Sequence, residues 1–299
     1  MSSTFNDLAD RVEAMLHGYT ENTEPSTWLT TSATTTTTTL NVYDASGIGR
    51  GYVQIDDEIV FVNNTDNVAN TLTLAPWGRG QRGTTAATHA QNAKLTASPL
   101  FPRNEIKKAI NNTIDAMYPM VFATGSTDFT FIAARTTYQL PSDFQNALSV
   151  TYSTVGPTKE WMPVRAYNLD RSADTDAFSS ARSISIYAGI VPGQTVHVFY
   201  SKRPTLMTSG TDVYETTTGM PSYSEDVVIY GAAFRMISFL DPSRLGPQSA
   251  SADILDGVRP TGSGQNASRF LFNIYQQRLN EVADNQRRQH PIRSLPEIG

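Results

Sequence analysis

The segment LNVYDASGIGRGYVQIDDEIVFV, residues 40–62, carries the clearest β pattern of the chain. Apolar and polar residues alternate along it, as in strands with one buried face, and Asp56-Asp57 is interpreted as a turn between two apolar runs. Threonine dominates residues 30–39 and favours strand, while the glycines of residues 78–83 require tight turns before a closing strand at Lys94 to Ala97. These features predict a small β module of two or three hairpins.

Outside this module, apolar residues recur at three- and four-residue spacing and predict helices. The helices are expected from Phe5 to Leu16, with Thr4 as N-cap, and at residues 103–117, 223–240 and 266–288. A second β region is expected, with strands at residues 128–133, 137–140, 147–153, 183–188 and 195–201. The stretch 227–240 is apolar nearly all round, which predicts a helix buried either inside its own chain or partly by neighbouring subunits.

The predicted fold class is α+β: a helical layer, made of the N-terminal, middle and C-terminal helices, with two small antiparallel β modules. The expected domains are an N-terminal helix or arm at 1–24, a small β module at 25–98, a helix and linker at 99–127, an antiparallel β-sandwich or barrel at 128–215, C-terminal helices at 216–288 and an extended tail at 289–299.

Composition argues against several classes of function. The 23 basic and 28 acidic residues give a formal net charge of -5, which disfavours a surface whose main task is to neutralise nucleic-acid phosphates. Cysteine is absent, which excludes disulfides and thiolate chemistry. The histidines are scattered without a second ligand at helical or loop spacing, so no metal, cofactor or catalytic residue is predicted; they are His17, His89, His197 and His290. Without a signal-peptide pattern or a membrane-length apolar run, a soluble protein made in the cytosol is expected.

Three stretches imitate a chemical site. GRGQRG, residues 78–83, lacks the Lys-Ser/Thr step of a phosphate-binding loop and is interpreted as a turn. The consecutive acids Asp56, Asp57 and Glu58 would point to alternating faces of a strand, so a solvated turn is favoured over a cation site. His197, in TVHVFY, is interpreted as a paired sheet residue rather than a catalytic base.

Basic residues are most concentrated at two places. One is Arg79 and Arg82 on the glycine-rich turn, and the other is Arg287 and Arg288 near the C-terminal end. Each pair is able to meet DNA or an acidic protein surface, but a solvated charge or an intersubunit ion pair is favoured for each. The final segment PIRSLPEIG is expected to be extended.

The order of four further motifs carries a family resemblance. They are AMYPMVF at 116–122, TYQLPSDFQNALSV at 137–150, GIVPGQTVHVFYSKRP at 189–204 and SYSEDVVIYGAAFRMI at 222–237. In this order the chain resembles the head-to-tail connector, or adaptor, proteins of tailed bacteriophages. The segment from IDDEIVFVNN to RGQRGTTAATHAQNAKL is similar to a small β module of phage virion proteins.

This resemblance implies a structural virion protein without catalytic turnover or cofactor. It implies a homo-oligomeric ring, a dodecamer by analogy, that joins the portal protein ring to tail or nozzle proteins and lines the channel through which double-stranded DNA passes. The expected location is the head-tail junction, after assembly in the host cytoplasm, with no membrane partner. Terminal segments commonly bind the portal in this family, which makes portal-binding candidates of Arg287, Arg288, His290, Ile292 and Leu295. Arg79 and Arg82 are candidates for channel or intersubunit contact.

Two other functions stay open. The threonine-rich β module also suits a minor tail or collar protein that binds fibres or host-surface glycans. A virion-associated hydrolase would use a carboxylate pair, for which the polar loop offers Asp170 and Asp174.

Overall fold

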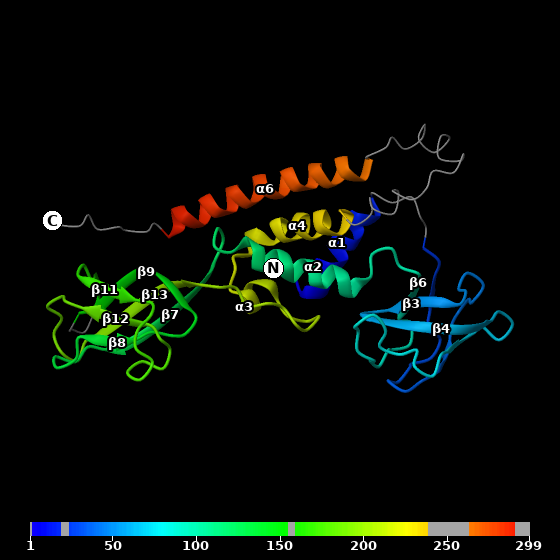
Figure 1. Ribbon diagram of the computed structural model, residues 1–299, viewed down its shortest axis with the longest axis horizontal. Coiled ribbons are helices and arrows are strands. Elements are labelled where there is room, and N and C mark those ends of the chain that lie inside the picture. Colours follow the sequence, from blue (N-terminus) through cyan, green and yellow to red (C-terminus); the bar gives the residue numbers. More distant parts are fainter. Residues whose placement is uncertain (1, 19–23, 155–158, 239–262, 291–299) are drawn as a thin grey trace. The chain divides into compact units, whose positions relative to one another are not determined.

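The computed structural model describes residues 2–18, 24–154, 159–238 and 263–290 (Figure 1). The chain divides into two compact units. Unit 1 comprises Met1–Phe5, Thr113–Val228 and Ile274–Gly299, and unit 2 comprises Asn6–Asn112 and Ile229–Asn273. Each unit therefore contains segments that lie far apart in the sequence.

Unit 2 contains a six-stranded antiparallel sheet with the order β1-β6-β3-β4-β5-β2. Its strands are β1 (Ser26–Trp28), β2 (Thr39–Asn41), β3 (Gly51–Ile55), β4 (Glu58–Asp66), β5 (Thr71–Leu74) and β6 (Lys94–Ala97). The predicted turn at Asp56-Asp57 joins β3 to β4, and Asp56 has a positive φ of 51°. Backbone hydrogen bonds next to β1 and β2 join the two edge strands, from Thr30 N to Asn41 O and from Tyr43 N to Trp28 O. The sheet thus curls round its own core and leaves little open edge.

The core of this sheet consists of aliphatic side chains from alternate positions of its strands. It includes Val53, Ile55, Val60, Val62, Leu72 and Leu95. Four of them, Val53, Ile55, Val60 and Val62, are apolar positions of the alternating pattern in residues 40–62, and Leu95 lies in the predicted closing strand. That pattern and the closing strand at Lys94–Ala97 are therefore confirmed.

The helices begin and end close to where their spacing predicts. They are α1 (Phe5–His17), α2 (Arg103–Met117), α4 (Glu225–Ile237) and α6 (Ser263–Gln289). Most residues of α4 are buried, as predicted from its apolar sequence, although residues 239–240 lie outside the described residues. Among the residues that the structure describes, no helix combines the length and the apolar character that a bilayer crossing needs.

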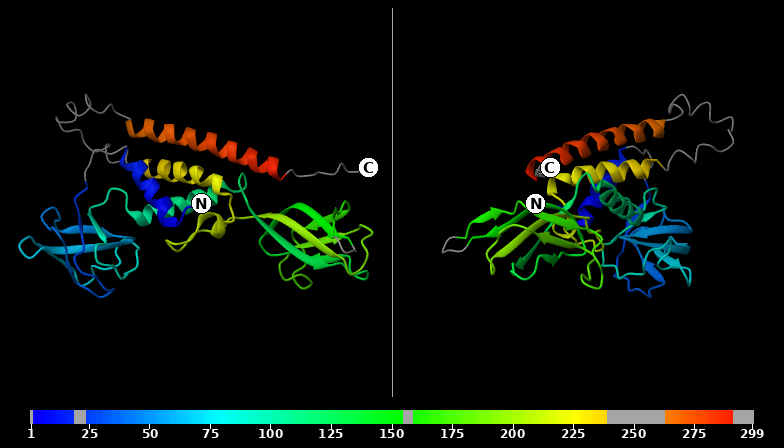
Figure 2. Two further views of the ribbon diagram at one scale, coloured as in Figure 1. Left: turned by 180° about the vertical axis from the view of Figure 1, so that it is seen from behind. Right: turned by 60° about the vertical axis from the view of Figure 1, so that its left-hand side comes forward.

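Unit 1 contains two sheets that share one hydrophobic core. The four-stranded sheet has the order β10-β9-β13-β7, and the three-stranded sheet has the order β11-β12-β8. Their strands are β7 (Ala123–Thr130), β8 (Thr137–Gln139), β9 (Phe144–Ser153), β10 (Trp161–Pro163), β11 (Tyr167–Asp170), β12 (Ser183–Ile186) and β13 (Thr195–Lys202). Figure 2 shows the long strands β9 and β13 side by side, and a break in their register follows Phe199. The shared core brings Phe144 of β9, Ile184 of β12 and Val198 of β13 together.

The predicted fold class is wrong. The chain is mostly β-sheet, in three sheets, and is not a helical layer that carries two small β modules. The error comes from strands of three or four residues, such as β1, β10 and β11, which are too short for readable alternation. Such strands form because a neighbouring strand supplies their hydrogen bonds, and no pattern within the strand itself encodes that neighbour.

Single elements were also missed or displaced. The short helix α3 (Tyr214–Thr218) and strands β10 and β11 have no predicted counterpart. β7 lies at Ala123–Thr130 rather than at residues 128–133, because all eight of its residues pair with β13. The polar face of β7, rich in Thr and Ser, hides its strand character from a search for apolar residues.

Candidate functional site

Two adjoining clefts lie beside the last turn of α6 in unit 1. The larger, of about 590 Å³, is lined by β9 and β13 together with Trp161, Tyr167, Gln289 and His290. The smaller, of about 390 Å³, is lined by residues 118–120, by Phe122, by β9 and by Arg287 and His290. Leu148 and His290 line both clefts, so the end of α6 borders a continuous half-apolar surface.

Gln286 attaches the end of α6 to the segment that follows α2. Its side chain is buried at 2% exposure. The amide Nε2 donates to the carbonyl oxygen of Phe122 at 2.7 Å, and Oε1 accepts from the Phe122 N–H at 3.0 Å. The side-chain amide thus pairs with both polar groups of one residue, as a neighbouring strand would. A buried pairing of this kind defines where the last turn of the helix lies.

Some side chains around Gln286 contact other residues of unit 1, and others are exposed. The His290 ring lies 5.3 Å from the Phe199 ring, and the Gln289 Oε1 accepts from the Tyr223 hydroxyl at 3.2 Å. Arg287 has 65% of its side chain exposed, and its one ion pair with a described residue joins it to Asp284, one turn earlier, at 3.6 Å. Arg288 is exposed as well. Of the portal-binding candidates, Arg287, Arg288 and His290 therefore cluster at this site, whereas Ile292 and Leu295 lie outside the described residues.

A second polar centre, around Glu58, is buried inside the β module of unit 2. Glu58 is 1% exposed. Its Oε1 accepts from Arg79 Nε and Gly80 N at 2.8 Å each, and its Oε2 accepts from Arg79 Nη2 at 2.8 Å, Ala87 N at 2.9 Å and His89 Nε2 at 2.9 Å. The interpretation of Glu58 as part of a solvated turn is therefore wrong, because only Asp56 and Asp57 of the three acids are exposed. Glu58 is the first residue of β4 and is buried, whereas the turn residues before it are exposed.

The Glu58 centre shifts the pKa values of its members. Burial works against the charge on Glu58, but the hydrogen bonds from Arg79 and His89 outweigh it and hold the carboxyl pKa well below its usual range. Burial likewise opposes protonation of His89, yet hydrogen bonds to Asp56 and Glu58 raise its pKa to about 9. The centre is therefore a closed cluster of charges at neutral pH.

All the side-chain N–H groups of Arg79 donate hydrogen bonds inside this centre. Two of its N–H groups reach Glu58, and the others reach the carbonyl oxygens of Thr34, Thr37 and Ala87. The arginine therefore binds the glycine-rich turn to β4 and to the threonine-rich segment of its own chain. A role for Arg79 in channel or intersubunit contact stays a prediction.

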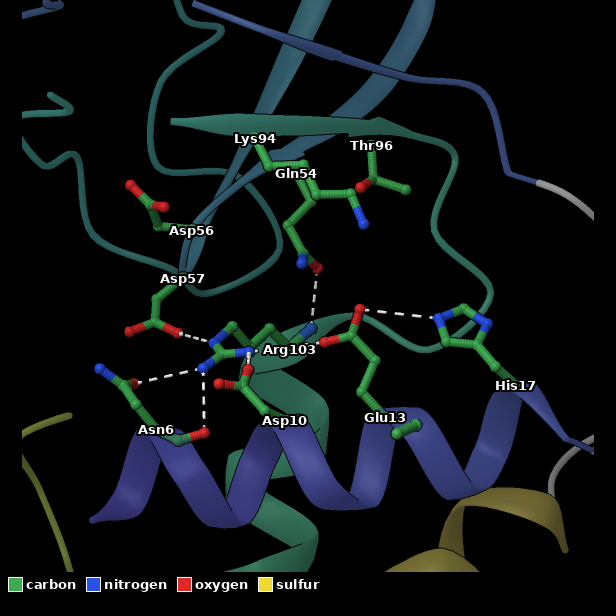
Figure 3. A pocket seen from close by; sticks show the side chains of 11 residues that line it. Asn6, Asp10, Glu13, His17, Gln54, Asp56, Asp57, Lys94, Thr96 and Arg103 are labelled. Atoms are coloured by element: carbon green, nitrogen blue, oxygen red, sulfur yellow. Dashed lines mark hydrogen bonds and ion pairs between the residues drawn. The ribbon is translucent and has the colours of Figure 1, made fainter. Parts of the chain in front are cut away.

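A cleft of about 550 Å³ in unit 2 surrounds Arg103 (Figure 3). The Arg103 guanidinium bonds to Asp10, lies 3.4 Å from Glu13 Oε2 and pairs with Asp57 Oδ1 at 3.3 Å. Its backbone N–H donates to Gln54 Oε1 at 2.8 Å. The cleft also contains Asp56, which is bound to His89. All four carboxylates of the cleft thus have a cationic partner in the same chain, so the cleft joins α1 and α2 to the sheet and is not suited to an outside ligand.

Comparison with known families identifies the protein at this level. Residues 84–295 match the family model described as SU10 adaptor protein. The chain belongs to the SU10 adaptor protein family. The predicted kinship with phage head-to-tail adaptors is thereby confirmed, and the protein is a structural adaptor and virion component of a bacteriophage that interacts with other virion proteins. A search of curated proteins finds no match.

Only one of the sites described lies wholly within the range that matches the adaptor family. The clefts at the end of α6 lie wholly within residues 84–295. Strands β1 to β5, with Glu58 and Arg79, lie before it. The family membership therefore bears on the α6 site and leaves most of the β module unassigned.

The remaining candidates of this adaptor have structural roles. His197 lies in β13 as predicted, bonded through Nδ1 to Asp128 of the paired strand β7. Asp170 Oδ1 accepts from Ser172 N and Asp174 Oδ1 accepts from Asp176 N, as carboxylates do in turns. Among the described residues, no group of three or more His, Asp or Glu side chains is arranged to hold a metal ion. The sequence contained no signal for Gln286, because a lone glutamine in a helix has no pattern.

Proposed function

We propose that this adaptor forms a homo-oligomeric ring, a dodecamer, that joins the portal ring to tail or nozzle proteins at the head-tail junction. The end of α6 and the segment after it, with Arg287, Arg288, His290, Ile292 and Leu295, bind the portal. The ring assembles in the host cytoplasm, works without catalysis and lines the channel through which double-stranded DNA passes.

The observation that carries this proposal is the contrast within one helical turn. Gln286 is buried and paired with Phe122, whereas Arg287 and Arg288 next to it are exposed. A rigid support with exposed guanidinium groups is what a docking surface needs, because little conformational entropy is lost when it binds. Arginine is also suited to carboxylates on a partner, since its planar fork donates two parallel hydrogen bonds.

The clefts beside this turn supply the apolar part of the surface. They are lined by Leu148, Phe199 and Trp161, and Trp161 is 48% exposed. Interfaces commonly combine aromatic side chains and arginine in this way. The final residues 291–299 contain further apolar side chains, Ile292 and Leu295, which suit a segment that binds in an extended form.

Charge supports passage of DNA without retention. The formal net charge of -5 gives the ring as a whole an acidic character, so DNA phosphates are not attracted to it generally.

The test is reconstitution of the ring with purified portal, imaged by negative-stain electron microscopy and measured by analytical ultracentrifugation. The double variant Arg287→Ala and Arg288→Ala is expected to keep its fold and to lose portal binding by at least tenfold. Removal of residues 291–299 is expected to weaken binding separately. The matched control is Arg171→Ala with Arg203→Ala, which removes two exposed arginines of unit 1 that line neither cleft. Portal binding that is equal in all three variants and the parent would refute the proposed docking surface.

A further inference from the structure

The β module carries an exposed strip of aromatic rings and guanidinium groups that no function described above uses. We call it the aromatic-arginine strip, and it consists of Arg50, Tyr52, Phe61, Trp77 and Arg82. Tyr52 of β3 and Phe61 of β4 are direct cross-strand partners, with ring centroids 5.2 Å apart in an edge-to-face arrangement. Trp77 stacks on Phe61 at 5.0 Å, and the Arg82 guanidinium lies 4.1 Å from the centre of the Tyr52 ring. The strip thus runs continuously across two strands.

The strip lies on the opposite side of the sheet from the core of the module. Tyr52 and Phe61 alternate with Val53, Val60 and Val62, whose side chains are buried in that core. The strip is consequently not needed to fill the interior. Trp77 remains 60% exposed even though one face of its ring stacks on Phe61.

The glycine-rich turn holds Trp77 and Arg82 in place. A Cβ at Gly78 would lie 2.6 Å from the carbonyl oxygen of Phe61, so only glycine allows the turn to come this close to β4. Arg82 itself has a φ of 51°, a left-handed conformation that is uncommon for arginine. Strain of this kind persists where the surrounding structure imposes it, and it is concentrated at functional positions.

Arg79 and Arg82 show the two possible uses of an arginine on one turn. The donors of Arg79 are all occupied within the chain. Arg82 and Arg50 make no hydrogen bond or ion pair with the described part of the chain, and each only lies over an aromatic ring. Stacking orients a guanidinium but leaves its N–H edge open, which is the edge that binds a carboxylate through two hydrogen bonds.

We propose that the aromatic-arginine strip binds a carboxylate-bearing segment of another virion protein, with an aromatic or apolar side chain of that segment packed on Trp77. Charge complementarity favours a partner with carboxylates, because Arg50 and Arg82, which have no ion pair with the described residues, flank the exposed aromatic rings. Trp, Tyr and Arg are also the side chains that dominate the energy of protein interfaces. A nucleic acid is less suited, since a DNA-binding surface pairs many more cations with phosphates. The strip lies before residue 84, outside the family match, and the inference does not rest on the α6 site.

The test uses the full chain with the substitutions Trp28→Phe and Trp161→Phe. Of the 3 tryptophans in the sequence, only Trp77 then remains. A random copolymer of glutamate and tyrosine is titrated in at physiological salt, and tryptophan emission and calorimetry report binding. Saturable binding is expected, at least tenfold tighter than to a lysine-tyrosine copolymer. Arg82→Asn should weaken it by at least tenfold while the thermal midpoint stays unchanged, because asparagine tolerates a positive φ. Trp77→Ala, followed by calorimetry, should weaken it similarly.

The controls separate this site from the α6 site and from other ligands. Arg287→Ala with Arg288→Ala should leave the copolymer-dependent change in Trp77 emission unchanged, because that emission reports on the strip alone, and Arg82→Asn should leave portal binding unchanged. Equal or tighter binding of alginate would assign the strip to anionic polysaccharide, and equal or tighter binding of oligo-thymidylate would assign it to single-stranded DNA. Either result, or an absence of saturable binding to the copolymer, would overturn the proposal.

Discussion

The centre around Glu58 and the end of α6 are both rich in charge, but they use it in opposite ways. At Glu58 each charge is met inside the chain, and the carboxylate alone accepts five hydrogen bonds. At the end of α6, Gln286 is buried while Arg287 and Arg288 are exposed. At Glu58 each charge depends on its partners, because removal of one leaves another buried and uncompensated, whereas charge left exposed beside a buried support is available to a partner protein.

The largest effect is expected from Glu58→Ala. The substitution leaves Arg79 and His89 buried without their carboxylate, and breaking a buried pair in this way costs about 3–5 kcal/mol of the free energy of unfolding. Denaturant unfolding of the full chain, followed by circular dichroism, measures the loss. Glu105→Ala is the matched control, because its ion pair with Lys108 is exposed and is worth less than about 1 kcal/mol. A loss below about 1 kcal/mol for Glu58→Ala would show that the centre does not stabilise the module.

The next effect is the dependence of stability on pH. The pKa of His89 rises to about 9 on folding, so its contribution is complete below pH about 6.5 and is lost as pH rises through about 9. The loss is on the order of 2–3 kcal/mol. The pKa of Glu58 is lowered, so its contribution exists above the ordinary value of 4.5 and declines as pH falls below it. Thermal unfolding across pH 2 to 10 should show both declines.

The variant His89→Gln sharpens this result, because it should abolish the alkaline decline and leave the acid one. An alkaline decline that persists unchanged in His89→Gln would assign it to another group.

A smaller effect is expected from Gln286→Ala. The N–H and carbonyl groups of Phe122 lose their partner, which costs about 1–3 kcal/mol when such groups stay buried. Hydrogen exchange of the Phe122 amide should accelerate, and portal binding should weaken because the support of Arg287 and Arg288 is lost. The exposed neighbour Asn285, changed to alanine, is the control. Unchanged exchange at Phe122 would contradict the role of Gln286.

The smallest effect on stability is expected from Arg287→Ala with Arg288→Ala. Both side chains are exposed, and surface substitutions of this kind change the free energy of unfolding by no more than about 0.5 kcal/mol. The same variant is expected to lose portal binding, so stability and binding separate here as they do not at Glu58. A loss of stability above about 1 kcal/mol would remove the distinction between the two regions.

The sequence predicted the elements better than their assembly. The helix at Arg103–Met117 and the strand at Lys94–Ala97 are confirmed at both ends, because each carries a complete local pattern. The fold class failed because strands as short as β10 and β11 contain too few residues for a readable alternation. The predicted domain division and the roles of the basic residues stay predictions.

The candidate sites divide in the same way. The composition of the α6 end indicated Arg287 and Arg288, but the charges of Arg79 and Arg82 looked alike in sequence. Only the structure separates them, since Arg79 turns toward Glu58 while Arg82 lies over Tyr52.

By itself, the sequence determined what depends on neighbours a few residues away: the periodicity of the helices, the turn at Asp56-Asp57, and the family through motifs that keep their order. Tertiary structure decided what depends on distant neighbours, namely which strands pair, that Glu58 is buried, and that Gln286 meets Phe122 across 164 positions of sequence. The physical reason is that burial and hydrogen-bond satisfaction belong to the environment that the folded chain creates round a side chain, and the same residue type is stable in either environment once its partners are supplied.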